Sequence, residues 1–282
     1  MFNYSTSLPQ PLGYPTSGDI QQLLSLPLNS LLPLFAAVFN ERKIIVQSSS
    51  PEKTSLFIAC LLEAFAPYEW QHLLIPFLPV KLTELTQTPT PFIIGVDPSV
   101  MQLIDMYDVF VFVDIDNGTV KSNDATIINS DLQIFPKKWI TSLSTVLTPL
   151  YSTVPSISSQ IKSQILKSAF LDFMTYFTQD IEDRVKLIVQ DGGDFNLKEF
   201  TKDFFIFGEG RKFIEVFSRT ATFDQFVQKI ERKLRTRGIA KVKRKPSLMT
   251  WLNISKETNL VDISTATVVT PQQANPPVFT FL

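Results

Sequence analysis

Short apolar runs recur through the first half of the chain, and segments with helical spacing separate them. The runs are continuous and rich in β-branched residues, as strands buried on both faces are. They are KIIVQ (43–47), HLLIP (72–76), PFIIGV (91–96) and DVFVFVDID (108–116). Strands that alternate with helices favour a mainly parallel sheet with helices on its faces. The pattern therefore predicts an α/β module over residues 20–135.

Helix start signals lie on both sides of the first predicted strand. In the apolar segment 20–40, Asn29 or Ser30 is a candidate N-cap for a helix that precedes the strand. After the strand, Ser50 is a candidate N-cap and Pro51 suits the first helical position. We therefore expect a strand–turn–helix unit, with a second helix that is apolar on nearly all sides and buried.

Helical spacing replaces the strand pattern after residue 136. In residues 160–177 every fourth position is apolar, which predicts a buried stripe along one helix. The stripe consists of Ile161, Ile165, Ala169, Phe173 and Phe177. We predict an all-helical module over residues 136–235 that packs on the α/β module. Residues 1–19 are expected to be a loose N-terminal segment, and residues 236–282 a tail that is first basic and then disordered.

The overall charge of the 282-residue chain is close to neutral, with a formal net charge of −1. This balance gives no reason to expect a nucleic acid partner. Residues 229–245, however, hold nine Lys and Arg against one Glu. A solvated helix end is the favoured explanation, and attraction to an anionic membrane is the alternative. The residues expected to contribute to a lipid-binding patch are Lys241, Lys243, Arg244 and Lys245.

Cysteine and histidine occur once each, as Cys60 and His72. A single cysteine excludes an internal disulfide and favours a reducing, cytoplasmic location. Zinc sites that need several Cys or His ligands are excluded too. No signal peptide or membrane-spanning stretch is visible, and the motifs G-x-x-x-x-G-K-[ST], G-x-G-x-x-G and G-x-S-x-G are absent. We therefore expect no cofactor and no covalent catalysis.

Individual candidates for chemistry each have a structural explanation that is favoured. His72 is the only possible imidazole base, but a histidine at the start of a strand, bonded to backbone, is the simpler interpretation. Cys60 lies in an apolar helix, where a buried thiol is inert. Asp114 and Asp116 follow a strand and could hold Mg²⁺. Asp116-Asn117-Gly118 is a hairpin-turn sequence, however, and the turn is preferred.

One further acidic stretch, DGGDFNLKEF (191–200), has a faint likeness to a calcium loop. It lacks the D-x-[DN]-x-[DN]-G pattern, and its glycines come too early. We expect a loop in which Asp194 or Asn196 caps the next helix.

Taken in order, several motifs resemble the DENN domain family. The runs are LFAAVFNERKIIVQSSS, LLEAFAPYEWQHLLIPFLP, TPTPFIIGVDPS and VFVDIDNGTV, followed by RKFIEVFSRTATFDQFVQKIE. The matching positions of the central module are Glu41, Pro67, Tyr68, Trp70, His72, Pro76, Leu78, Pro79, Pro89, Pro91, Phe92, Gly95, Asp114 and Asp116. The matching positions of the downstream helical module are Phe213, Phe217, Thr220, Phe223 and Phe226. The resemblance covers residues 25–232.

The resemblance implies a fold and a function. The fold is the C-terminal lobe of a DENN domain, and the function is that of an exchange factor, which promotes GDP release from Rab-family small GTPases in membrane traffic. The matched residues are then fold markers or GTPase contacts, not catalytic groups. An adaptor that binds a GTPase without exchange is the alternative. Only about 25 residues precede the central motif, so we expect the N-terminal longin-like lobe to be missing. The chain is then a fragment, a half that a partner with a longin-like lobe completes, or a short divergent form. A peripheral location on vesicular membranes would fit this role.

Overall fold

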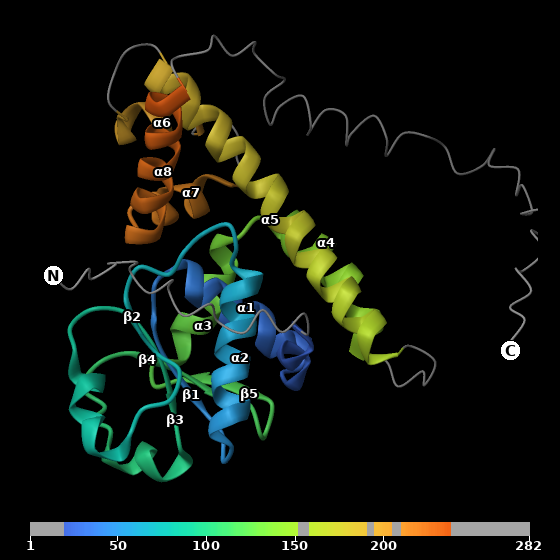
Figure 1. The fold of residues 1–282 in the computed structure, drawn as a ribbon, viewed down its shortest axis with the longest axis vertical. Coiled ribbons are helices and arrows are strands. Elements are labelled where there is room, and N and C mark those ends of the chain that lie inside the picture. The colour runs from blue at the N-terminus through green and yellow to red at the C-terminus, as the bar shows by residue number, and fades with distance from the viewer. Residues whose placement is uncertain (1–19, 152–157, 191–194, 205–209, 238–282) are drawn as a thin grey trace, which may run out of the picture. The chain divides into compact units, whose positions relative to one another are not determined.

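Five strands form one sheet in the order β2-β3-β1-β4-β5. The computed structural model describes residues 20–151, 158–190, 195–204 and 210–237 (Figure 1). The strands are β1 (Lys43–Gln47), β2 (Leu73–Ile75), β3 (Phe92–Val96), β4 (Phe110–Asp114) and β5 (Thr119–Ser122). The first four are parallel and β5 returns antiparallel to β4. The predicted α/β fold with a mainly parallel sheet is confirmed.

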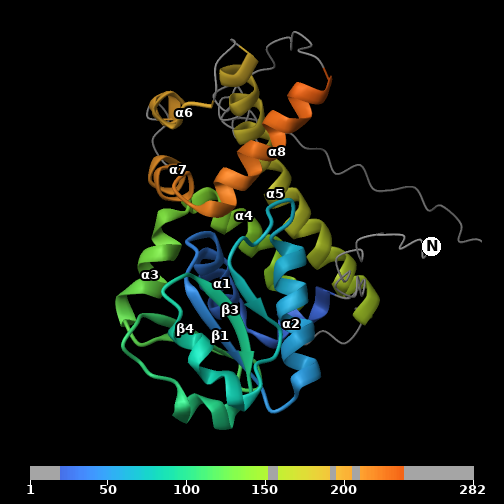
Figure 2. The ribbon, with the colours of Figure 1, turned by 60° about the vertical axis from the view of Figure 1, so that its left-hand side comes forward.

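The two faces of the sheet are covered differently. Helices α1 (Leu28–Phe39) and α2 (Pro51–Ala64) contact one face, and α2 lies along the sheet in Figure 2. The other face carries a buried cluster around Ile45 and Ile94, together with residues of the two short 3-10 helices η2 (Val80–Gln87) and η3 (Pro98–Leu103). Helix α3 (Ala125–Ile134) lies beside β5.

The start of α2 follows its predicted signals. Ser50 is the N-cap, its hydroxyl accepts a 3.2 Å hydrogen bond from the backbone N–H of Lys53, and Pro51 occupies the first turn. The predicted N-cap of α1 is wrong. The helix begins one residue after Pro27, whose carbonyl accepts hydrogen bonds of 2.9 Å from the backbone N–H groups of Ser30 and Leu31. Asn29 and Ser30 therefore lie inside the first turn.

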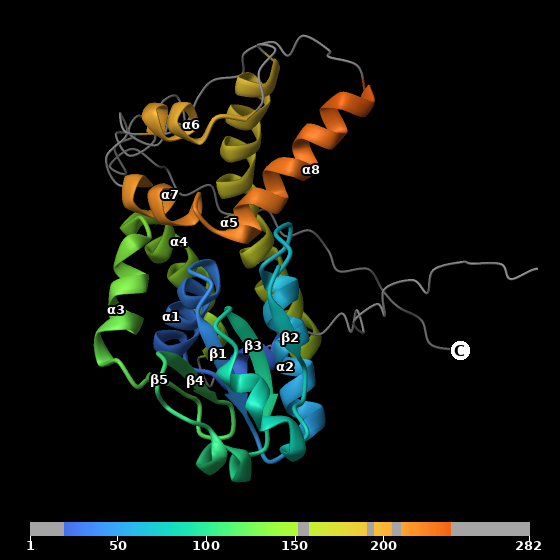
Figure 3. The same cartoon turned by 90° about the vertical axis from the view of Figure 1, so that its left-hand side faces the viewer.

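The second half of the described chain is helical, as predicted. Its elements are α4 (Lys137–Leu147), η4 (Thr148–Tyr151), α5 (Ser159–Gln190), α6 (Leu197–Phe204), α7 (Arg211–Phe217) and α8 (Ala221–Arg237). Another 3-10 helix, η1 (Ile20–Ser25), precedes α1. Helix α5 contacts α8 and α4, and Figures 2 and 3 show α8 beside α5.

The buried face of α5 differs from the predicted stripe. Ile161, the first stripe residue, is 48% exposed, and the buried positions fall at Leu166, Phe170 and Met174. Of the other stripe residues, Ala169 is buried and Ile165 and Phe173 are half-buried, while the side chain of Phe177 lies outside the described residues. The buried face of α5 is therefore shifted by one residue from the predicted stripe. The neighbours against which the helix packs determine this face, and a strict four-residue spacing does not locate them.

An aromatic cluster around Phe39 joins the two halves of the chain. The Phe39 ring lies 5.4 Å from Phe135, 5.5 Å from Phe213 and 5.2 Å from Phe217, measured between ring centroids. Edge-to-face pairs of this kind add stabilisation beyond the burial of apolar area. The phenylalanine-rich helices therefore pack directly on the end of α1.

The predicted module boundaries, at 135/136 and 235/236, stay predictions. Within the described ranges, no helix is long and apolar enough to cross a membrane. Residues 1–19 and 238–282, and with them Lys241, Lys243, Arg244 and Lys245, lie outside the described residues.

Candidate functional site

Glu41 occupies the turn between α1 and β1 with an unusual backbone. Its φ is 49°, in the left-handed region, which costs a residue with a side chain about 1 kcal/mol or more. The turn ends α1, because the backbone N–H groups of Glu41 and Arg42 bond to the carbonyls of Val38 and Ala37 at 3.1 Å. A glycine would suit this position best, so the interactions of the Glu41 side chain are of particular interest.

The Glu41 carboxylate binds the first turn of α8. One oxygen accepts a 3.1 Å hydrogen bond from the backbone N–H of Ala221, and the other a 2.8 Å bond from that of Thr222. Both donors are N–H groups that a helix start leaves without partners inside the helix. A negative charge is also favourable at the positive end of the helix dipole. Glu41 therefore caps α8 from a distant part of the chain.

His72 completes this contact. Its Nε2 lies 2.9 Å from Oε2 of Glu41, a close polar contact without the alignment of a regular hydrogen bond. Burial disfavours the charged form of Glu41, yet the contact with His72 and the hydrogen bond from Thr222 outweigh it and lower the pKa of the carboxyl. The predicted partner of His72, the backbone, is wrong. The partner is a carboxylate, which the sequence places 31 residues earlier.

The segment around Tyr68 forms the rest of the joint with α8. The Tyr68 ring is buried, with centroids 4.7 Å from Phe226 and 5.0 Å from Phe217. Beside it, a carboxylate oxygen of Glu69 accepts a 2.7 Å bond from Nζ of Lys229. Pro67, which follows α2 through a cis peptide bond, begins this segment. We call these contacts, together with those of Glu41 and His72, the α8 joint.

Trp70 supports the joint from the strand side. Its indole N–H donates a 3.2 Å hydrogen bond to the carbonyl of Leu73, the first residue of β2. Its ring meets His72 edge to face at a centroid distance of 5.3 Å. Trp70 therefore holds the start of the edge strand β2 and packs against one side of the His72 imidazole.

Gly95 and the nearby prolines set a close approach between two strands and α2. A Cβ atom at Gly95 would lie 2.1 Å from the carbonyl oxygen of Pro76 and 2.5 Å from Cγ2 of Thr54. The Gly95 carbonyl accepts a 2.7 Å bond from the N–H of Leu78. Pro79 follows as the N-terminal neighbour of η2. Only glycine fits here, because the backbone after β2 passes directly over β3.

Pro91 directly precedes β3, a place where a residue that cannot donate a backbone hydrogen bond is tolerated.

Asp114 and Asp116 bind different partners. Asp114 accepts bonds from the backbone N–H groups of Asp116 and Asn117 at 3.1 and 2.9 Å, which is the geometry of an Asx turn. Desolvation disfavours its charged form, but these bonds and the side-chain amide of Asn117 outweigh that effect and lower the pKa of Asp114. Gly118 closes the turn with a φ of 64°. The turn explanation accounts for both the sequence and the geometry.

Asp116 instead turns back to the start of α2. Its carboxylate accepts a 2.6 Å bond from Nζ of Lys53, a 2.9 Å bond from Oγ of Ser48 and a 2.8 Å bond from the N–H of Ser49. The Lys53 ammonium, followed by the Ser49 N–H, holds the pKa of Asp116 far below its usual range. Asp116 therefore joins the β4–β5 hairpin to the start of α2.

The remaining candidates for chemistry are Cys60 and the acidic stretch 191–200. Cys60 is buried in α2. Asn196 caps α6 by accepting a 3.0 Å bond from the N–H of Lys198, so this alternative for the cap is confirmed, while Asp194 lies outside the described residues. Within the described ranges, no group of three or more His, Cys, Asp and Glu could hold a metal ion.

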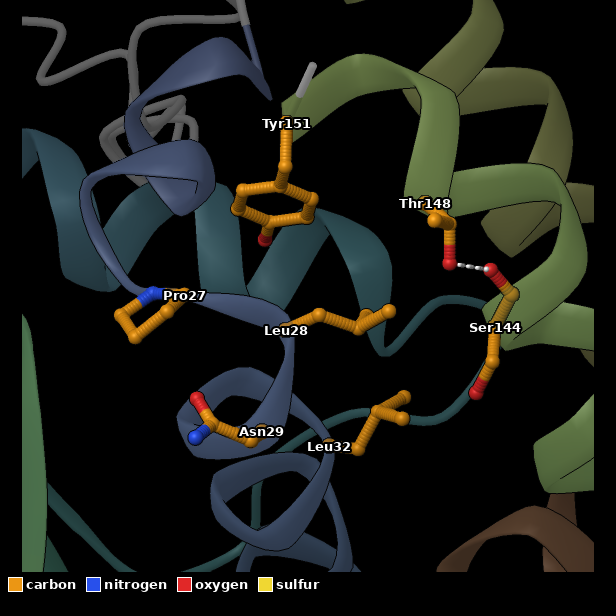
Figure 4. Close-up of a pocket in the computed structure, with 7 residues that line it drawn as sticks. All are labelled: Pro27, Leu28, Asn29, Leu32, Ser144, Thr148 and Tyr151. Atoms are coloured by element: carbon orange, nitrogen blue, oxygen red, sulfur yellow. Dashed lines mark hydrogen bonds between the residues drawn. The ribbon is translucent and has the colours of Figure 1, made fainter.

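An open apolar pocket lies between the start of α1 and the α4–η4 segment. Its volume is about 490 Å³, and its walls include Leu28, Leu32, Thr148 and Tyr151. In Figure 4 the Tyr151 ring reaches from η4 toward the segment that carries Pro27 and Leu28. Burial raises the pKa of the Tyr151 phenol to about 12, so the hydroxyl stays neutral at physiological pH.

The fold and the joint define a class of protein: a parallel α/β sheet that is tied to a following helical module through one carboxylate and a set of aromatic rings. Residues 3–118 match the model of the DENN (AEX-3) domain. The resemblance drawn from the motifs is therefore confirmed, and this segment is DENN-domain sequence.

The chain is also similar to curated DENN proteins. It is 33% identical over 136 residues to DENN domain-containing protein 1B of Mus musculus, which covers 44% of the chain and 17% of that relative. It is 27% identical over 234 residues to DENN domain-containing protein 2A of Mus musculus, with 77% and 22% covered. DENN domain-containing protein 1A of Homo sapiens is 26% identical over 212 residues, with 73% and 19% covered. The matches thus span about a fifth of the length of these relatives.

Proposed function

We propose that this chain binds a Rab-family small GTPase and promotes the release of its GDP in membrane traffic. The single observation that carries the proposal is the DENN-domain match over residues 3–118. The matched positions Glu41, His72 and Asp116 join separate parts of the fold. Structural roles of this kind agree with a protein that acts by binding a partner at its surface.

Exchange of this type needs only differential binding. A protein that binds the nucleotide-free GTPase more tightly than the GDP-bound form lowers the affinity for GDP by the same factor. Each tenfold factor corresponds to about 1.4 kcal/mol. A rigid surface gives the largest difference in affinity between the two forms of the GTPase. A surface that adapts to both forms binds them equally well and does not favour GDP release. The α8 joint supports such rigidity, because it fixes α8 to the turn after α1 and to the segment that precedes β2.

The test is release of a fluorescent GDP analogue from a panel of Rab GTPases with unlabelled nucleotide in excess. We expect acceleration of at least one member, with a rate that rises with the concentration of the chain. Release driven by EDTA shows that each GTPase was loaded, and the heat-unfolded chain is the negative control. Exchange is ruled out if the chain accelerates no member, either alone or with a separately supplied longin-like lobe.

An adaptor that binds a GTPase without exchange is the second candidate. It is motivated by the extent of the matches, which span only 17% to 22% of the relatives, because part of a surface suffices for binding more readily than for exchange. Pull-down with nucleotide-free and GTP-loaded Rab separates the two. Preference for the nucleotide-free form supports exchange, and preference for the GTP-loaded form supports an adaptor.

A further inference from the structure

Exposed apolar side chains gather in one part of the described chain. The described ranges hold twelve large apolar side chains that are exposed, and half of these fall between residues 80 and 109. They are Val80, Leu82, Leu103, Met106, Tyr107 and Val109. Tyr107 is 94% exposed and Leu103 is 57% exposed. Single exposed apolar residues need no explanation, but a concentration of them marks an interaction surface.

These six residues come from one layer of the fold. They lie on η2, on η3 and on the loop that leads into β4, and η2 and η3 contact each other over the same sheet face. Both 3-10 helices lie at the lower left in Figure 1 and at the base of the sheet in Figure 3. Lys43 ties the loop to the end of η2, because its ammonium donates to the carbonyl of Thr88 at 2.6 Å and to the carboxylate of Asp108. We call this surface the η2–η3 band.

The charge of the band is acidic. Residues 80–109 hold one basic side chain, Lys81, and four acidic ones. The acidic residues are Glu84, Asp97, Asp105 and Asp108. Of these, Asp108 is paired with Lys43. The band therefore combines exposed apolar side chains with a net negative charge, and we call its acidic residues the rim.

The sign of this rim decides between the possible occupants. An anionic membrane would be repelled by it. A second copy of this chain, docked around a two-fold axis, would place negative rim against negative rim. A protein face with apolar side chains inside a rim of Lys and Arg is attracted and fits both features.

We propose that the η2–η3 band docks the GTPase, through a face of that partner on which Lys and Arg surround apolar side chains. The inference rests on the proposed function, since it names the surface of this chain that the GTPase uses. Tyr107 and Leu103 are the expected anchors, because large exposed apolar and aromatic side chains contribute most when a partner buries them.

The binding test uses the full chain and a nucleotide-free Rab that the unaltered chain retains in the panel. Tyr107→Ser and Leu103→Ser should each weaken the affinity about tenfold. Leu171→Ser is the matched control: Leu171 is 60% exposed on α5, outside the band, and its replacement should leave the affinity unchanged. All three substitutions are at exposed positions, so thermal unfolding should match that of the unaltered chain.

The charge test uses the rim. Asp105→Lys and Glu84→Lys should each lower the association rate about threefold or more at low salt, and the difference should shrink at high salt because the rim acts through screened charges. Lys81→Glu should change the rate in the opposite direction.

The outcomes separate this inference from the proposed function. If the unaltered chain binds no Rab, both fall. If it binds and the Tyr107 and Leu103 variants bind equally well, the proposed function stands and the docking surface is wrong. The inference is also overturned if Tyr107→Ser instead dissolves a dimer in sedimentation velocity, or instead abolishes binding to phosphatidylserine vesicles.

Discussion

The carboxylate of Glu41 accepts a 2.8 Å hydrogen bond from the backbone N–H of Thr222, a residue 181 positions further along the chain. The contact joins the turn after α1 to the first turn of α8. It also places one acidic side chain between a helix start and the only imidazole of the protein. Because Glu41 holds a strained backbone conformation, this contact determines much of what can be tested at the joint.

Replacement of Glu41 should loosen the α8 joint. Glu41→Gln keeps one acceptor but loses the charge, and we expect a loss of about 1–2 kcal/mol in the free energy of unfolding. Glu41→Ala leaves two backbone N–H groups of α8 without their acceptor, and the loss should reach roughly 2–3 kcal/mol. Urea unfolding followed by circular dichroism measures both.

The control for Glu41 is Glu215→Gln. Glu215 faces Arg219 at 3.4 Å on the exposed side of α7, and exposed pairs contribute little. A stability of Glu41→Ala equal to that of Glu215→Gln would show that the cap does not stabilise the fold.

The same carboxylate predicts a pH dependence. The pKa of Glu41 lies below its ordinary value of 4.5 in the folded chain, so its stabilisation is complete above that value and disappears as pH falls through the lower folded pKa. The stability difference between the unaltered chain and Glu41→Gln should therefore shrink below about pH 4.5.

Asp224 on α8 acts in the opposite direction. Burial and the nearby charge of Glu41 raise its pKa, so its protonation stabilises the folded state as the pH falls. Making the same comparison in an Asp224→Asn background removes this contribution. The prediction is contradicted if Glu41→Gln lowers the stability by the same amount at every pH from neutral down to the acidic end of the titration.

The strands and the start of α2 could be predicted because their causes are local. KIIVQ and PFIIGV each contain a continuous apolar run, and this is the pattern of a strand buried on both faces. Ser50 and Pro51 act on the turn that directly follows them. The role of His72 could not be predicted in this way, since its partner Glu41 belongs to another turn and the two meet only after the sheet has formed.

Helix faces were predicted less well, for a related reason. The predicted stripe on α5 lies one residue away from the buried face, because packing against neighbours on several sides determines which face is buried, and the spacing alone does not. The α8 joint had one signal in the sequence: an acid in a turn that would favour glycine. In the sequence alone that acid has no visible partner, because Ala221 and Thr222 contribute only backbone N–H groups to it.

Gly95 should tolerate no larger residue. A Cβ atom there would lie 2.1 Å from the backbone oxygen of Pro76, so Gly95→Ala must displace the chain after β2. We expect a loss of roughly 1–3 kcal/mol or more in the free energy of unfolding. The matched control is Gly210→Ala, where the nearest atom, Cγ of Pro136, lies at an ordinary 3.8 Å. Equal thermal unfolding temperatures for both variants would contradict the prediction, because they would mean that the chain after β2 moves away from β3 without loss of stability.

The ion pair between Arg42 and Asp131 should be sensitive to loss of the acid. The guanidinium binds both carboxylate oxygens, at 2.8 and 2.6 Å, and the Asp131 side chain is fully buried. Asp131→Ala leaves the arginine charge without its partner, and we expect a loss of about 3 kcal/mol. Arg219→Gln, which breaks an exposed pair at the C-terminal end of α7, should change stability by less than about 1 kcal/mol. Urea midpoints of the two variants that coincide would rule out a structural role for the buried pair.

The basic residues 241–245 provide a prediction outside the described fold. Each Lys or Arg near an anionic bilayer contributes on the order of 1 kcal/mol of attraction, and the attraction falls as salt rises. Neutralising Lys241, Lys243, Arg244 and Lys245 to Gln should therefore greatly reduce sedimentation of the chain with phosphatidylserine vesicles at low salt. Phosphatidylcholine vesicles, which are neutral, should bind neither protein.

The η2–η3 band supplies an internal control, because its acidic rim predicts that Tyr107→Ser leaves vesicle binding unchanged. If the fourfold variant sediments with anionic vesicles as the unaltered chain does, the basic run does not bind lipid, and a solvated helix end is sufficient to explain it.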